Sequence, residues 1–89
     1  MTETEGVWWV DGPKLRSLRV ARELSMAQLA RQARIGQSTL SRLERSAGPG
    51  RMTWPPMVVA LAAELGVPAE QLIGGEVGAF RSALGERPR

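Results

Sequence analysis

The sequence of 89 residues has no cysteine, no histidine and no tyrosine, and only one phenylalanine. Without cysteine, disulfides and thiolate metal sites are excluded, and we expect neither a metal nor a cofactor. The longest apolar run, Met57 to Ala63, is far too short to cross a membrane. The first residues, MTETE, are acidic, whereas a signal peptide begins with basic residues. We therefore expect a cytoplasmic protein with no membrane contact and a mainly aliphatic core.

Charge is distributed unevenly along the chain. Residues 1–13 hold three acidic residues and no basic one, whereas residues 14–51 hold nine basic and two acidic residues, a net charge of +7. Eight of these nine basic residues are arginine. A basic block in a chain whose net charge is only +3 indicates an anionic polymer as partner. A solvated, charged surface without a partner is the alternative explanation.

Apolar residues recur at helical rather than alternating spacing, which predicts a single all-α domain with a short extended segment near its start. We divide the chain into an N-terminal extension over 1–12, the helical domain over 13–73 and a C-terminal tail over 74–89 with room for a short helix. An extended run is expected at 7–10 and the pair Gly74-Gly75 is expected to break the chain. The five expected helices span 13–23, 25–33, 37–45, 54–65 and 68–73.

The stretch from Leu24 to Arg45 carries the clearest local signals. Ser25 followed by Gln28 forms a capping box, which begins a helix. Arg34-Ile35-Gly36 is read as a tight turn, and a second short helix follows it. Two short helices joined by such a turn are typical of a helix-turn-helix, whose second helix usually enters the DNA major groove.

Several motifs stand in one order: L-x-x-L-R at 15–19, then LSMAQLARQA, STLSRLER and LAAELGVPAEQLI. Together they resemble the phage repressor and Cro family of helix-turn-helix proteins, the XRE family, over about residues 13–73. The resemblance implies a five-helix, lambda-repressor-like fold that binds double-stranded DNA through helix 37–45. It also implies an ion pair between Arg19 and Glu44, which would tie the first helix to the third.

The family places its DNA contacts on two short helices. The resemblance implies that outward residues of helix 37–45 face base edges, namely Gln37, Ser38, Thr39, Ser41 and Arg42. Their chemistry suits this task, since glutamine pairs with adenine and arginine with guanine. The contacts expected with phosphates are Ser25, Met26, Arg31, Arg45 and Arg51. Without the resemblance, the polar face of an ordinary surface helix would look the same.

Three residues depart from the family pattern. Met26 stands where glutamine is common, which leaves only the backbone for that contact. Arg34 stands where a left-handed glycine usually begins the turn, and such a conformation is unfavourable for arginine. Gly36 replaces the usual Ser or Thr cap and is a weaker cap.

Two tryptophans and the apolar C-terminal region lie outside the DNA-reading helices. If residues 7–10 are extended, Trp8 and Trp9 point to opposite faces. Both could pack on their own domain, or one could join two copies of the chain. A homodimer would read two half-sites. The candidate dimer contacts are Trp8, Trp9, Leu72, Ile73, Phe80 and Leu84.

Three function classes follow from these features. The first is a transcriptional regulator, a repressor that binds a palindromic operator as a dimer. The second is an antitoxin or adaptor that uses the same fold mainly to bind another protein. The third, an enzyme, is disfavoured because the sequence offers no histidine, no cysteine and no phosphate-loop motif.

Overall fold

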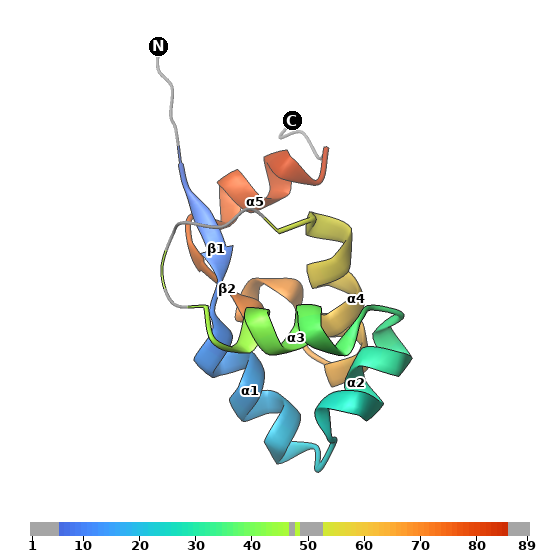
Figure 1. Cartoon of the computed structure of the whole chain (residues 1–89). Coiled ribbons are helices and arrows are strands. Elements are labelled where there is room, and N and C mark those ends of the chain that lie inside the picture. Colours follow the sequence, from blue (N-terminus) through green and yellow to red (C-terminus); the bar gives the residue numbers. More distant parts are fainter. Residues whose placement is uncertain (1–5, 47, 49–52, 86–89) are drawn as a thin grey trace.

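The structure is a computed structural model that describes residues 6–46, 48 and 53–85. It contains five α-helices, one 3-10 helix and two short strands in these ranges (Figure 1). The five-helix, all-α expectation is confirmed, with a two-stranded ribbon added at one side. The elements are β1 (Trp8–Val10), α1 (Gly12–Ala21), α2 (Met26–Ala33), α3 (Gln37–Glu44), α4 (Pro55–Leu65), η1 (Ala69–Leu72), β2 (Ile73–Gly75) and α5 (Val77–Ala83).

The first two helices begin at side-chain caps. The Asp11 carboxylate accepts a hydrogen bond from the Lys14 amide at 3.1 Å and so caps α1. The capping box of α2 is confirmed: Ser25 Oγ accepts from the Gln28 amide at 3.0 Å, and Gln28 Oε1 accepts from the Ser25 amide at 2.8 Å. These bonds satisfy donors that a helix N-terminus otherwise leaves unpaired.

The turn between α2 and α3 has the left-handed conformation that is unfavourable for arginine. Arg34 adopts the left-handed conformation, with φ 61° and ψ 44°. The amide of Ile35 then donates to the Ala30 carbonyl at 2.9 Å, and the half-buried Ile35 side chain packs against the core. Gly36 precedes α3 and caps it with no side-chain hydrogen bond.

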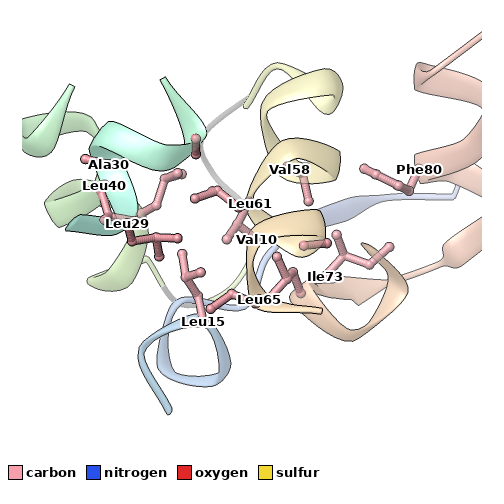
Figure 2. Close-up of a cluster of buried hydrophobic side chains, with 14 residues drawn as sticks. Val10, Leu15, Leu29, Ala30, Leu40, Val58, Leu61, Leu65, Ile73 and Phe80 are labelled. Atoms are coloured by element: carbon pink, nitrogen blue, oxygen red, sulfur yellow. The ribbon is translucent and has the colours of Figure 1, made fainter. Parts of the chain in front are cut away.

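Helix α4 is the centre of the core. Its Val58, Leu61 and Leu65 are fully buried, and in Figure 2 they lie between the leucines of α2 and α3 and the ring of Phe80. Pro55 and Pro56 occupy its first turn, where helical amides lack partners anyway. The chain enters this helix through Trp54, which forms no side-chain cap bond.

The region around the two glycines differs from the expected chain break. Gly74 and Gly75 lie in β2, which pairs antiparallel with β1 in the register Trp8↔Gly75, Trp9↔Gly74 and Val10↔Ile73. A Cβ atom on Gly74 would approach the Trp9 indole nitrogen to 2.6 Å, so a residue without a side chain is needed beneath this ring. The preceding helix, expected over 68–73, is a 3-10 helix of four residues.

We call β1, β2 and α5 the accessory unit. The rings of Trp8 and Phe80 meet edge to face, with centroids 5.0 Å apart and planes at 77°. Phe80 and Val10 belong to the same buried cluster as the leucines of α1 to α4. The described parts of the N-terminal extension and of the C-terminal tail therefore extend the core of the helical domain. No helix in the described ranges is long and apolar enough to cross a membrane.

Candidate nucleic-acid interface

Helix α3 is fixed to the protein along one face. Leu40 and Leu43 are buried, and the Glu44 side chain beside them is only 4% exposed. The expected ion pair with Arg19 is present: Arg19 Nε donates to Glu44 Oε2 at 2.5 Å, and Arg19 Nη2 donates to Glu44 Oε1 at 3.0 Å. Arg19 Nη1 also donates to the Leu24 carbonyl at 2.8 Å, so one guanidinium joins α1, α3 and the start of α2.

The electrostatics of this pair favour its charged form. The bidentate hydrogen bond to Glu44 raises the pKa of the Arg19 guanidinium above its ordinary value, and burial opposes that change. A bidentate pair also fixes geometry, since both parallel hydrogen bonds require one relative orientation. The pair therefore sets the rotation of α3 about its axis.

A close backbone approach fixes the end of α3. The Gly12 amide donates to the Ser46 carbonyl at 3.1 Å. A Cβ atom on Gly12 would lie 2.4 to 2.6 Å from the carbonyl oxygens of Leu43, Glu44 and Ser46. Because no real Cβ atom comes so close to backbone, only glycine allows α1 to begin against the last turn of α3.

The opposite face of α3 points to solvent. Ser38, Arg42 and Arg45 are exposed and spaced by four and three residues, which places them on one helix face. Gln37 is exposed at the first turn, whereas Thr39 and Ser41 are half-buried at the flanks of this face. We call Ser38, Arg42 and Arg45 the outward row. Two of the five residues expected to face bases, Ser38 and Arg42, lie in this row, and the other three lie next to it. Arg45, which was expected to contact phosphate, is also in the row.

The N-terminus of α2 offers backbone rather than side-chain groups. The hydroxyl of Ser25 is engaged in the capping box, and the Met26 side chain is half-buried against the core. The amides of Met26 and Ala27 lie in the first turn, where no helical carbonyl is available to accept from them. A helix N-terminus also carries partial positive charge, so these two amides suit a phosphate oxygen.

The basic residues separate into two groups. Arg19 is engaged with Glu44, and the guanidinium of Arg22 lies against Gly66 at the carboxyl end of α4, where a Cβ atom would meet it at 2.5 Å. Arg19 therefore serves the fold. Arg31 on α2 and Arg45 in the outward row of α3 are exposed, while Arg51 lies outside the described residues.

The structure changes the set of candidate dimer contacts. Leu72, Ile73 and Phe80 are buried within one chain, and Trp8 packs edge to face on Phe80. Buried side chains offer no contact surface, so Leu72, Ile73 and Phe80 are corrected to core residues. Trp8 is half-buried and stays a candidate. Trp9 and Leu84 are half-buried, and Val77 is exposed at the start of α5.

Arg34 is absent from the contacts predicted from the sequence. It is exposed, three residues before Gln37, at the turn that leads into α3. The signal that could have identified it is the difference from the family pattern: a long basic residue stands where a left-handed glycine usually begins the turn.

The sequence and the fold match known proteins. Residues 12–72 match the family described as the helix-turn-helix domain. No curated protein matches the sequence. Among solved structures the chain is similar to PhpD with cadmium atoms, with 31% identity and a TM-score of 0.58, over 72% of this chain and 13% of that chain. The chain thus spans only a small part of PhpD.

Two smaller proteins match over most of their length. The restriction-modification controller protein C.AhdI from Aeromonas hydrophila is 27% identical with a TM-score of 0.57, over 67% of this chain and 86% of that chain. SinR, described as the master regulator for biofilm formation and solved in complex with DNA, is 24% identical with a TM-score of 0.57, over 66% of this chain and 90% of that chain. The similarity to SinR concerns the fold alone. The match over residues 12–72, together with these folds, identifies the chain as a member of the helix-turn-helix domain family, of the XRE type that its motifs resemble.

Proposed function

We propose that the protein is a sequence-specific DNA-binding transcription regulator that reads the major groove with α3. The observation that carries this proposal is the outward row of Ser38, Arg42 and Arg45 on a helix whose other face is held by Leu40, Leu43 and the Arg19–Glu44 pair. A rigid helix with hydrogen-bonding side chains along one exposed face suits the width of the major groove.

The charge of the surface supports the same function. Between Glu23 and Glu44 the chain has three arginines and no acidic residue. Glu44 itself is neutralised by Arg19. Residues 24–43 of α2 and α3 therefore contribute only positive charge, which favours association with DNA at low salt.

The finer proposal is a repressor that binds a palindromic operator as a two-fold dimer. A single α3 reads few bases, whereas two copies about 34 Å apart would read successive major grooves on one face of the duplex. The similarity to the controller protein C.AhdI supports a regulatory role. For the dimer we favour the start of α5, where Val77 is an exposed apolar side chain.

We also propose that the protein is not an enzyme. A hollow of about 630 Å³ runs along α1, where its ionisable lining residues are Arg16 and Glu44. Glu44 is engaged by Arg19, so this hollow has no pair of groups suited to acid–base catalysis.

Selection from a pool of random duplexes would find the preferred site, and Arg42→Ala would then test the reading face. We expect the variant to lose roughly 1–3 kcal/mol on the selected duplex and to relax the preference at one position. Gln71→Ala, an exposed polar residue on η1, is the matched control and should bind normally. Equal losses on selected and random duplexes would place Arg42 among the phosphate contacts instead.

Sedimentation tests the dimer. Val77→Glu should shift the protein towards the monomer and weaken operator binding, whereas Ser82→Glu, on a different side of α5, should do neither.

If DNA affinity is low and insensitive to salt in the wild type, the antitoxin or adaptor function replaces the regulator.

A further inference from the structure

Arg34 adopts a left-handed backbone conformation, which most other described residues with a positive φ adopt as glycines. Six described residues have a positive φ, and four of them are glycines, namely Gly48, Gly66, Gly75 and Gly85. The two exceptions are Glu23, with φ 56°, and Arg34, with φ 61°. In this region the Cβ atom of an L-residue crowds its own carbonyl oxygen, so glycine would be the more stable choice at either position.

Nothing in the described part of the fold uses the Arg34 side chain. It is exposed, and no hydrogen bond or ion pair joins its guanidinium to another described residue. Only its backbone is needed for the turn, because the Arg34 amide donates hydrogen bonds to the carbonyls of Ala30 and Arg31. A glycine at this position would offer the same amide. The favourable effect of a cation at the carboxyl end of α2 is already provided by Arg31 in the last turn.

The place of Arg34 indicates what its side chain serves. Gln37, the first residue of α3, is three positions further along the chain, so at most about 11 Å of chain lies between them. A helix that enters the major groove is flanked by the phosphates of both strands, and the groove is only about 12 Å wide. A guanidinium beside the N-terminus of that helix is therefore within reach of the phosphates that border the groove. A guanidinium can form two parallel hydrogen bonds with a phosphate.

We propose that Arg34 is a DNA-phosphate contact, retained at a left-handed position where glycine would give the more stable fold. This inference rests on the proposed DNA-binding function and assigns a further residue to it. Strained backbone at a position where the fold does not require that side chain is characteristic of binding sites.

The decisive variant is Arg34→Gly, because the proposal predicts opposite signs for two measurements. The melting temperature should rise by several degrees, since the strain is relieved. Affinity for a short duplex of arbitrary sequence should fall about tenfold per bound copy, as expected for the loss of one hydrogen bond to a charged group. The log–log slope of affinity against salt should become shallower by about 0.9 per bound copy.

Two matched variants separate the causes. Glu23→Gly relieves the same kind of strain in the turn between α1 and α2, so it should raise the melting temperature without weakening DNA binding. Arg34→Lys keeps both the charge and the strain, so the melting temperature should stay near that of the wild type and most of the affinity should remain.

The remaining outcomes overturn the inference in distinguishable ways. If the wild type binds the duplex and Arg34→Gly binds it equally, with the same salt slope, the contact is absent and the proposed function stands. If Arg34→Gly lowers the melting temperature, the side chain serves the fold and the inference is wrong. If the wild type does not bind duplex DNA at low salt, the proposed function fails and the inference fails with it.

Discussion

The helix-turn-helix of α1, α2 and α3 and the accessory unit of β1, β2 and α5 are stabilised by different kinds of contact. In the first, the start of α2 and the turn into α3 are set by residues close in sequence, namely the capping box of Ser25 and Gln28 and the left-handed turn at Arg34. The Arg19–Glu44 pair adds one contact between residues distant in sequence. In the second, strand pairing joins residues 8–10 to residues 73–75, and the main aromatic contact joins Trp8 to Phe80. The accessory unit therefore depends on contacts that form only when both ends of the chain meet.

The largest expected effect tests whether the two regions share one core. Phe80→Ala should lower the free energy of unfolding by about 3–5 kcal/mol, and Leu40→Ala, the matched change in α3, by about 2–5 kcal/mol. Because the side chains of α4 lie between these two residues (Figure 2), we expect a single urea transition for each variant. A Phe80→Ala protein that unfolds at the wild-type midpoint would show that the accessory unit is independent.

The next effect concerns the one nearly buried ion pair of the described helix-turn-helix. Glu44→Gln removes the carboxylate and leaves the guanidinium of Arg19, only 11% exposed, without its counter-charge. We expect a loss of about 3–5 kcal/mol in chemical denaturation, and a smaller loss when Arg19→Met and Glu44→Leu are combined. In a cycle of Arg19→Met, Glu44→Leu and the double variant, additive losses would argue that the pair is not coupled.

A moderate effect is expected at the cap of α2. Ser25→Ala removes the acceptor for the Gln28 amide and should cost about 1 kcal/mol of stability, visible as a lower melting temperature. The accessory unit supplies the control, because Glu76 at the N-cap of α5 makes no side-chain cap bond. Glu76→Ala should therefore change stability by less than about 0.5 kcal/mol. An equal effect of both changes would remove this distinction between the regions.

The smallest effect lies at the surface where α5 of the accessory unit meets η1. The hydrogen bond from Arg81 lowers the pKa of Glu70 below its ordinary value of 4.5. A carboxyl whose pKa is lowered by folding stabilises the native state above its unfolded pKa, and this contribution is lost as pH falls through the folded pKa. NMR titration should show this lowered pKa, and Arg81→Gln should raise it. An unchanged titration in the variant would assign the shift to another group.

The local features of the helix-turn-helix could be predicted because each depends on a few neighbouring residues. Ser25 and Gln28 predict the capping box by their spacing alone. The Arg19–Glu44 pair could be placed because family motifs fix the relation between α1 and α3, although the two residues are distant in sequence.

The accessory unit could not be predicted in the same way. Two consecutive glycines predict a break in the regular structure of the chain. Gly74 is instead part of a strand, where glycine is required because the ring of Trp9 covers it. Phe80 suggested an exposed contact, since nothing in its own segment shows that Trp8 will cover it. Arg34 showed a departure from the family pattern, but whether its backbone accepts the left-handed conformation is decided only by the closed fold.

The pairing of β1 with β2 also determines where the chain can be extended without touching its reading helix. Gly6 lies against Glu76 and Ala79 at the start of α5, and Gly85 follows the end of that same short helix. In Figure 1, α5 and the start of β1 accordingly lie at the opposite end of the molecule from α1 and α2. A fluorophore, a surface anchor or a fused reporter attached at either end would therefore be carried by the accessory unit, which allows immobilised protein to be assayed with α2 and α3 unobstructed.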